Sequence, residues 1–419
     1  MGSSKLLSNA EWAPAVENCL GMKQFEVLNY VLRPLGSTGG FLGDHYTAEV
    51  TVRLHEDKNI QKILHFFLKT EPKAANDCKI TKQINVFKKE VDTLNIIFVK
   101  MKSVLKEGGK NMVWACKCFY TQPEFIILED LSKQGFRSFT LRDSLRYEHF
   151  ELTMKALANM HAASIIFEEA QSKQPYRLID DYPDVLEEAL FRHAPNHPGT
   201  RWIMCSIKTM WLLVELIHGK DALSEVKSEL ERIMLSLYDL QKPSGRFRNV
   251  VCQGDVKRDN ILFRHENGIP VDVRIVDYQF TRYAPPANDI MCFFYLSSYK
   301  SFRDRHFTEL LTVYYHQFSK NLWEHGLDPE KLLSWRKFKE SCDFYRIVGL
   351  LIGACYCPGT YISPENIKHV FDSSEVERYI YDDRDQEVKY SFYNDDFYKE
   401  NVEDIVNELL EYTKKSKQK

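Results

Sequence analysis

The sequence predicts an α+β protein with two lobes, in which an N-terminal lobe built on an antiparallel sheet precedes a mainly helical C-terminal lobe. The chain has 419 residues, more than one typical hydrophobic core needs. Three strand-like apolar runs, rich in β-branched and aromatic residues, lie between residues 25 and 69. The region 171–248 instead has the pattern of several helices with short breaks. We therefore place the N-terminal lobe at 1–128 and the C-terminal lobe at 129–419.

Two acids and an amide in the middle of the chain predict phosphoryl transfer. Asp255 and Asn260 are five positions apart, which is the spacing of a catalytic loop in which an acid orients an acceptor hydroxyl and an amide binds a metal ion. Asp and Asn are common turn formers, so this pair alone would usually mark a turn. A second acid, Asp277, ends a later apolar run, and this addition favours a phosphate site.

The residues around this pair predict a β-hairpin. Apolar runs at 261–263 and 271–276 flank a turn at 266–270 that contains Asn-Gly. The hairpin would return Asp277 to the side of Asn260. Two oxygen ligands would then face one pocket, as Mg²⁺ requires, so these two residues are candidate metal ligands.

A kinase also needs a cation for the nonreacting phosphates, normally a strand lysine held by a helix carboxylate. The third strand-like run ends at Lys69. Further along, apolar residues recur at steps of three and four, as on one face of a helix, and Glu90 lies on the same stripe. A buried carboxylate is costly without a cation, so Glu90 is paired with Lys69. The alternative is an acid that favours the start of a helix. The apolar members of the stripe are Phe87, Leu94, Ile97 and Met101.

Two further segments would contact the nucleotide. A glycine-rich turn at 36–44 joins two of the predicted strands and is flexible enough to approach phosphates closely. An apolar strand that starts at residue 125 ends in Glu-Asp where a kinase chain crosses between its lobes, so its backbone is placed to contact adenine. The candidate residues in these segments are Gly43, Asp44, Glu129, Asp130 and Leu131.

In this order, the motifs resemble the ecdysteroid kinase-like family, also called CHK kinase-like, which is similar in fold to choline and aminoglycoside kinases. The resemblance covers roughly residues 20–380, from the 39–46 turn through 157–164 to 289–296. It implies a small-molecule kinase that uses ATP and Mg²⁺. By the resemblance, the catalytic acid would be Asp255, the magnesium ligands Asn260 and Asp277, the phosphate clamp Lys69 and Glu90, and the adenine hinge Glu129 to Leu131.

The chain departs from the family pattern at two positions of the predicted catalytic loop. The family usually has histidine where this chain has Gln253, and tryptophan where it has Lys257. Glutamine can donate and accept hydrogen bonds, so activity is not excluded. Lys257 follows Asp255 by two residues and is a cation able to reach the transferring phosphate, with a solvated loop lysine as the alternative.

Two other polar residues are interpreted as structural. His161 shares a helical stripe with apolar residues, and a core histidine with bonded ring nitrogens is favoured over a catalytic one. Asp289 follows a Pro-Pro pair and is expected to cap the next helix.

Composition narrows the partners and the compartment. A formal net charge of −3 gives no basic field for nucleic acid. The 10 cysteines are too few for a disulfide framework in so long a chain, and Cys116-x-Cys118 and Cys355-x-Cys357 lack zinc-site spacing. No apolar stretch is long enough to span a bilayer. We expect buried thiols, a cytosolic protein and a small-molecule substrate.

The acceptor is the least determined part of the prediction. The reaction would transfer the γ-phosphoryl group of ATP to an alcohol, and the abundant aromatic residues fit a bulky apolar acceptor. By resemblance, this is an ecdysteroid hydroxyl or a xenobiotic compound undergoing detoxification. A polar acceptor of the choline or aminoglycoside type, and a nucleotide-binding pseudokinase, are the alternatives. Apolar residues that would suit a pocket, but are more often core, are Trp202, Met204, Met210, Trp211 and Leu212.

Overall fold

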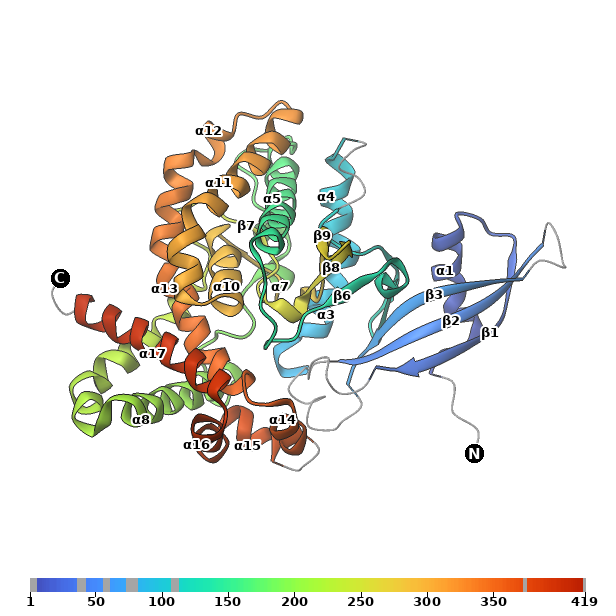
Figure 1. Ribbon diagram of the computed structural model, residues 1–419. Coiled ribbons are helices and arrows are strands. Elements are labelled where there is room, and N and C mark those ends of the chain that lie inside the picture. The colour runs from blue at the N-terminus through green and yellow to red at the C-terminus, as the bar shows by residue number, and fades with distance from the viewer. Residues whose placement is uncertain are drawn as a thin grey trace.

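The chain folds into two lobes, as the sequence predicts. The computed structural model describes residues 6–35, 43–55, 61–72, 82–106, 113–371 and 375–416. In Figure 1 the strands of the small lobe lie on the right, and most of the helices lie on the left. The α+β bilobal prediction is therefore confirmed. The exact division of the chain at residue 128 stays a prediction.

The small lobe is built on a five-stranded antiparallel sheet with the order β1-β2-β3-β5-β4. Its strands are β1 (Phe25–Pro34), β2 (Asp44–Leu54), β3 (Gln61–Thr70), β4 (Cys118–Gln122) and β5 (Phe125–Glu129). In β2 the buried residues Ala48, Val50 and Val52 alternate with more exposed ones, because one face of the strand packs on a core. β3 pairs with β2 on one side and β5 on the other, so Lys69 lies inside the sheet.

A helix that the sequence analysis did not predict, α1 (Asn9–Leu20), packs against this sheet. Ser8 and Glu11 form a capping box, in which each side chain accepts a hydrogen bond from the backbone N–H of the other residue. Trp12 is fully buried and contacts the rings of Tyr30 and Phe66. The Ser-x-x-Glu spacing at residues 8–11 was the available signal for this helix.

The predicted amphipathic helix is present, but it is not a continuous α-helix. It consists of α3 (Val86–Asp92), a π-helical segment η2 (Thr93–Ile97) and α4 (Phe98–Val104). A π-helical segment rotates the following turn relative to the preceding one. Every stripe residue is nevertheless buried: Phe87, Glu90, Leu94, Ile97 and Met101.

The large lobe is arranged around two helix pairs. Helix α5 (Tyr147–Glu169) packs against α11 (Lys300–Glu324), and α10 (Ala287–Ser297) packs against α13 (Trp335–Thr360). Helices α8 (Pro198–Leu235) and α17 (Asp396–Ser416) pack against α13 and each other (Figure 1). The other helices are α6 (Leu178–Asp181), α7 (Pro183–Leu186), α9 (Leu237–Leu240), α12 (Pro329–Leu333), α14 (Pro364–Phe371), α15 (Val376–Tyr381) and α16 (Asp385–Asn394).

The predicted catalytic segment, residues 251–279, lies among short β-strands. β8 (Ile261–Glu266) and β9 (Ile269–Ile275) form the predicted hairpin, and β6 (Phe136–Ser138) pairs with β8. The turn of the β8–β9 hairpin contains Asn267 and Gly268, which both have positive φ, at 51° and 77°. These values suit the Asn-Gly turn that connects two twisted strands. β7 (Val250–Cys252) pairs with β10 (Arg282–Ala284) and leads into the catalytic loop.

In the described part of the chain, no helix is long and apolar enough to cross a membrane. Cys116, Cys118, Cys355 and Cys357 are free thiols, and burial raises the pKa of Cys355 to about 12 and that of Cys357 to about 11. The prediction of buried thiols fails at Cys19, which is exposed.

Candidate active site

The catalytic loop is held in a tight backbone conformation after β7. Gly254 has a φ of 88°, and a Cβ at this position would lie 2.0 Å from the carbonyl oxygen of Phe280. Only glycine fits, because any side chain would both strain the backbone and collide with it. The carboxylate of Asp289, in the first turn of α10, accepts hydrogen bonds from the N–H groups of Gln253 (2.7 Å) and Gly254 (2.9 Å). The expected helix cap at Asp289 is therefore wrong: this acid fixes the loop.

Asp255 has one bonded and one unbonded carboxylate oxygen. Its Oδ2 accepts hydrogen bonds from Lys257 Nζ (2.7 Å) and Asn260 Nδ2 (3.0 Å), and among the described residues no donor has direct hydrogen-bond geometry to the buried Oδ1. Only 4% of the residue is exposed, and burial raises the pKa of Asp255 although Lys257 acts in the opposite direction. An unsatisfied buried oxygen is costly, so Oδ1 is a point where an incoming hydroxyl would be stabilised.

Lys257 is not a solvated loop lysine. Its side chain is 14% exposed and lies between Asp255 and Asp259, whose oxygens are 2.7 and 3.5 Å from Nζ. Burial alone would lower the pKa of Lys257, but the surrounding carboxylates raise it above its ordinary value. The amine is therefore charged at neutral pH. Contact with a transferring phosphate stays a prediction.

Asp277 lies directly beyond β9, where the hairpin brings it to the catalytic loop. Val276 N–H donates to the Asn260 carbonyl (2.9 Å), so the two candidate ligands belong to adjacent backbone segments. Asp277 has a φ of 64°, a left-handed conformation that is unusual for a residue with a side chain. Its Oδ1 accepts from Lys69 Nζ (2.8 Å) and its Oδ2 from Gln279 Nε2 (3.2 Å).

This donor set fits a magnesium ion. Asn260 Nδ2 donates hydrogen bonds to the backbone carbonyl and to Oδ2 of Asp255. The Asn260 Oδ1 makes no hydrogen bond within the described ranges. A carboxylate and an amide oxygen from neighbouring strand ends are the ligand types that Mg²⁺ binds, with water and phosphate oxygens completing the coordination.

The predicted ion pair between the small lobe and its helix is present. Lys69 Nζ lies 2.5 Å from Glu90 Oε2, and these residues are 4% and 2% exposed. Glu90 Oε1 accepts a hydrogen bond from Tyr278 N–H (3.1 Å), which connects α3 to the segment that carries Asp277. Burial would lower the pKa of Lys69, but Asp277 and Glu90 raise it. Glu90 is thus not a helix-start acid; it bonds a lysine and a backbone amide.

A double-mutant cycle is expected to show that Lys69 and Glu90 act as one unit. Lys69→Met and Glu90→Gln should each lower kcat/KM, and the double variant should lose far less than the product of the two effects. The coupling energy should be about 1–3 kcal/mol, because each single change leaves the other charge buried. Steady-state kinetics of the four proteins measures it. Multiplicative losses would mean that the two side chains contribute independently.

Gln253 replaces the family histidine and connects the two acids of the site. Its Nε2 donates to the carbonyls of Val276 (3.0 Å) and Asp277 (2.7 Å), and its Oε1 accepts from Asp255 N–H (2.7 Å). The residue is fully buried. The amide therefore uses both its donor and its acceptor, so the loop geometry does not require histidine.

Removing these hydrogen bonds is expected to lower activity. Gln253→Leu should reduce kcat at saturating ATP by about tenfold or more, since each buried polar group left unpaired costs about 1–3 kcal/mol. Gln253→His, which keeps one donor and one acceptor, should retain more activity than the leucine variant. Unchanged turnover in Gln253→Leu would show that the loop is held without this side chain.

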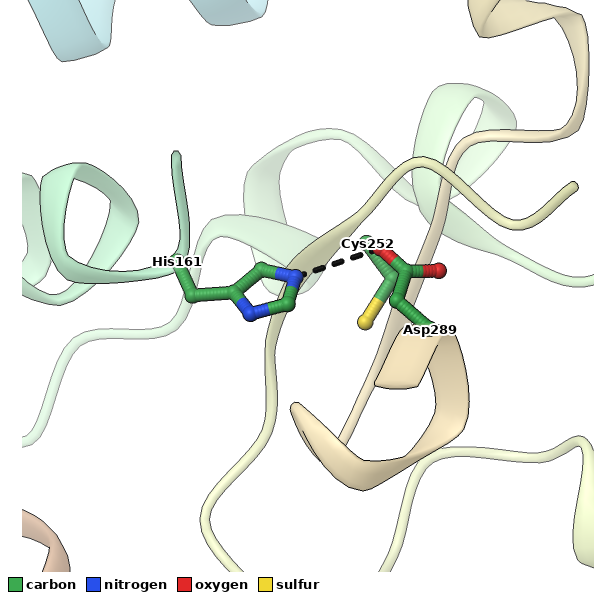
Figure 2. A group of neighbouring side chains, drawn as sticks. All are labelled: His161, Cys252 and Asp289. Carbon is green, nitrogen blue, oxygen red and sulfur yellow. Dashed lines mark hydrogen bonds and ion pairs between the residues drawn. The ribbon is translucent and has the colours of Figure 1, made fainter. Parts of the chain in front are cut away.

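His161 lies in a buried cluster with Asp289 and Cys252. Figure 2 shows its ring pointing toward the Asp289 carboxylate, with Nε2 at 3.1 Å from Oδ2. Its Nδ1 is 2.8 Å from the Tyr314 hydroxyl. The ligand atoms of His161, Cys252 and Asp289 all lie within 4.8 Å of one another, which is the spacing of a metal site. The Cys252 thiol, however, donates to the carbonyl of Ala284 (3.4 Å), and burial raises its pKa. A protonated thiol and a carboxylate already bonded to the loop favour a structural hydrogen-bond network.

The predicted nucleotide-contacting backbone is only partly described. Residues 36–42 of the glycine-rich turn lie outside the described ranges. Gly43 lies against the clamp lysine, since a Cβ there would be 3.1 Å from Lys69 Cε, and Asp44 begins β2. Of the predicted hinge, Glu129 N–H donates to the Lys117 carbonyl (2.9 Å) and is therefore engaged within the protein.

The other two hinge residues form the start of a short 3₁₀ helix. Asp130 Oδ1 accepts a hydrogen bond from Ser132 N–H (3.1 Å), which caps η4 (Leu131–Gln134). Leu131 is the first residue of this helix and is buried. The side chain of Asp130 therefore shapes the crossing, and adenine contact by these backbone groups stays a prediction.

Three residues near the site were not singled out from the sequence. His45 on β2 lies opposite Lys69 on β3 in the strand register. Burial together with the lysine charge lowers the pKa of His45 to about 4. Arg282 donates to the Gly254 carbonyl (2.7 Å). Tyr356, on α13, has a pKa raised by burial and by the Asp255 carboxylate beside it. Strand register and the packing of distant helices bring these three residues to the candidate active site, and no local sequence pattern predicts that position.

Two lobes are present, a lysine of the small lobe bonds Glu90 and Asp277, and the loop of the large lobe carries Asp255. This combination places the chain in the class of protein-kinase-like phosphotransferases. The particular family follows from a family model that matches residues 39–326: the chain belongs to the ecdysteroid kinase-like family. It is a small-molecule kinase, a phosphotransferase that acts on a hydroxyl group. The resemblance stated from the sequence is confirmed.

Solved structures similar to this chain include an ethanolamine kinase of Plasmodium vivax, with 13% identity, a TM-score of 0.39, and coverage of 86% of this chain and 81% of that one. A Streptomyces rimosus aminoglycoside phosphotransferase solved with ADP and streptomycin has 12% identity and a TM-score of 0.33, covering 78% and 92%. A microcompartment-associated aminopropanol kinase has 11% identity and a TM-score of 0.34, covering 84% and 95%. Similarity this low carries no conclusion about the acceptor. No curated protein sequence matches the chain.

Proposed function

We propose that this kinase transfers the γ-phosphoryl group of ATP to a hydroxyl of a bulky apolar acceptor, such as an ecdysteroid-like steroid or a xenobiotic alcohol. The observation that carries the proposal is the state of Asp255. One carboxylate oxygen is held by Lys257 and Asn260, and the other makes no direct hydrogen bond of ordinary geometry among the described residues, with the Tyr356 hydroxyl beside the carboxylate. A fixed carboxylate with one unbonded oxygen is suited to accept the proton of an acceptor hydroxyl and to hold that hydroxyl in line with the phosphate.

The other residues would bind the nucleotide and its metal ion. Lys69, held by Glu90, would contact the nonreacting phosphates, and Lys257 would approach the transferring one. Asn260 and Asp277 would hold Mg²⁺, which neutralises phosphate charge when bound. Gly43 and Asp44, and the backbone at Glu129, Asp130 and Leu131, would contact the phosphates and adenine respectively.

An aromatic wall beside Asp255 supports an apolar acceptor. Tyr356 lies next to this carboxylate, and its ring meets that of Trp202 edge to face with centroids 4.9 Å apart. Trp202 in turn contacts Phe191 at 5.9 Å. Among the α8 residues, Trp202 is buried and contacts Tyr356, whereas Met210 is fully buried core. Aromatic rings next to the base would contact the hydrocarbon body of an acceptor.

We infer a cytosolic location and a role in detoxification or steroid turnover from the same proposal. Free and largely buried thiols suit a reducing compartment. Phosphorylation would make an apolar alcohol strongly anionic and thereby prevent it from crossing membranes.

The test is a screen for ADP release with the Mg²⁺–ATP-saturated enzyme, followed by mass spectrometry of the acceptor. The panel contains polyhydroxylated sterols, phenols, glycosides and amino alcohols, each matched with an analogue in which the hydroxyl is methylated. Phosphorylated product from sterols or phenols, absent with the methylated analogues, supports the proposal. Product only from amino alcohols or glycosides would replace it with a polar-acceptor kinase. Tight ATP binding with no product from any class would favour the pseudokinase.

A further inference from the structure

A cavity of about 520 Å³ lies at the junction between the end of α4 in the small lobe and helices α5 and α11 in the large lobe. It falls within the size range of small-molecule sites, about 300–1,000 Å³. None of the candidate catalytic side chains lines it. Its lining residues include Leu105, Val113, Trp114, Asn159, Gln317 and Asn321. It is therefore separate from the phosphoryl-transfer site.

Two side-chain amides of this cavity have unused hydrogen-bonding groups. Gln317 Nε2 and Asn321 Nδ2 both donate to Asn159 Oδ1, at 3.0 and 2.8 Å. Within the described ranges, this leaves Asn159 Nδ2 without an acceptor and Gln317 Oε1 without a donor. One group is a donor from α5 and the other an acceptor from α11, and their side chains are joined by the Gln317 Nε2–Asn159 Oδ1 hydrogen bond. Such a pair complements the edge of another carboxamide, which presents one acceptor and one donor.

A buried indole adds a third unused group. Trp114 is 2% exposed, and no residue of the described ranges accepts a hydrogen bond from its Nε1. Leaving a buried donor unpaired is unfavourable, and a carbonyl or ring nitrogen in the neighbouring cavity would relieve that cost. The remaining wall around it is partly apolar, with Leu105 and Ile166 buried.

We propose that this cavity binds a neutral small molecule that carries a carboxamide-type edge on a compact aromatic body. Its unused inner groups are all uncharged, which disfavours an ion. The rim carries charges of both signs: Lys106 Nζ donates to the Glu324 backbone carbonyl, and Lys320 Nζ lies 4.0 Å from the Glu324 carboxylate. An ionised ligand would lose its hydration and would meet rim charges of both signs, whereas a neutral one loses less hydration and can use the uncharged inner groups.

A ligand in this cavity would act on the nucleotide site through Trp114. The Trp114 carbonyl accepts a hydrogen bond from Ile275 N–H (2.7 Å), two residues before Asp277. The Phe98 ring contacts both Trp114 (6.3 Å between centroids) and Tyr278 (4.7 Å). Since Tyr278 N–H bonds Glu90, ordering of Trp114 would favour the bonded form of the phosphate clamp.

The direct test uses nicotinamide as the probe and nicotinate as its charged counterpart. Saturation-transfer NMR is recorded on the full chain with Mg²⁺ and a non-hydrolysable ATP analogue, so that the nucleotide site is already filled. We expect saturable binding of nicotinamide with a Kd of about 1 mM or tighter, a level accessible to a ligand of about nine heavy atoms, and at least tenfold weaker binding of nicotinate.

Two variants assign the binding to the cavity. Asn159→Asp replaces the unused donor with an oxygen at constant size and should weaken nicotinamide at least tenfold. Asn407→Asp makes the same change at an exposed position of α17 and should leave Kd unchanged. If Asn159→Asp unfolds, Gln317→Leu provides the same comparison. No saturable binding to the wild type, or equal binding to the Asn159 or Gln317 variant, overturns the site.

The coupling to the nucleotide has its own readout. Saturating nicotinamide should change the Kd of Mg²⁺–ATP at least twofold in the wild type, and Trp114→Phe, which removes the indole N–H, should reduce that change. Binding in the cavity with an unaltered nucleotide Kd would overturn the coupling. Neither result depends on which acceptor the enzyme phosphorylates.

Discussion

Asp255→Asn is expected to lower turnover by about 10²-fold or more while leaving the Kd of ATP within a few-fold. Asparagine keeps the size of the side chain and a group for Lys257 and Asn260 to contact, but it cannot accept the proton of the acceptor hydroxyl. The unpartnered Oδ1 is the atom whose basicity is lost. Because the proposed contact of Asp255 is with the acceptor, nucleotide binding has no strong reason to change.

The measurement is single-turnover product formation with the acceptor found in the screen, together with calorimetric titration of Mg²⁺–ATP. Asp259→Asn, a change to a more exposed carboxylate in the same loop, is the matched control and should stay within a few-fold. Equal product formation by wild type and Asp255→Asn would show that this acid is not the base.

The same prediction has a pH signature. Burial raises the pKa of Asp255, and the base acts only when deprotonated. Turnover of the wild type should therefore fall on the acid side at a pH above the ordinary pKa of an aspartate, as the carboxylate is protonated. The residual activity of Asp255→Asn should not show that acid limb.

Local sequence patterns were sufficient to predict the parts of the site that lie on regular elements. The hairpin followed from two apolar runs around Asn267 and Gly268, and it fixed the position of Asp277 relative to Asn260. The position of Glu90 on a helical apolar stripe implied a buried cation. Such inferences succeed because backbone geometry alone determines which face or strand end a residue occupies.

Contacts made by tertiary packing were not predictable in this way. The Pro-Pro pair before Asp289 predicts a helix-capping position, but the Asp289 carboxylate instead accepts hydrogen bonds from two backbone amides of a loop over thirty positions earlier. The π-helical segment at Thr93–Ile97 left the apolar spacing unchanged and was therefore invisible in the sequence. Tyr356 interacts with Asp255 because α13 packs on α10, whose first turn holds the catalytic loop, and no spacing in the chain encodes that neighbour.

Asp277→Asn is expected to weaken Mg²⁺-dependent ATP binding or turnover by well over tenfold, more than about 1.4 kcal/mol. The change keeps the shape of the side chain but removes the negative charge that would face the metal ion. It also removes one of the two carboxylates near Lys69 Nζ, so that Glu90 alone would hold the amine. The effect should increase as Mg²⁺ is lowered, because a weakened ligand is partly compensated by a higher metal concentration.

Thermal unfolding with and without Mg²⁺–ATP separates this effect from a loss of folding. Bound ligand stabilises the folded state by RT ln(1 + [L]/Kd), so a weaker Kd should reduce the ligand-induced rise in Tm while the Tm of the free protein changes less. Asp272→Asn is the control and should retain the full rise, because this β9 carboxylate bonds Arg274 and the Val273 N–H and no other group of the described residues. An undiminished Mg²⁺-dependent rise in Asp277→Asn, with normal turnover, would show that this carboxylate does not hold the metal ion.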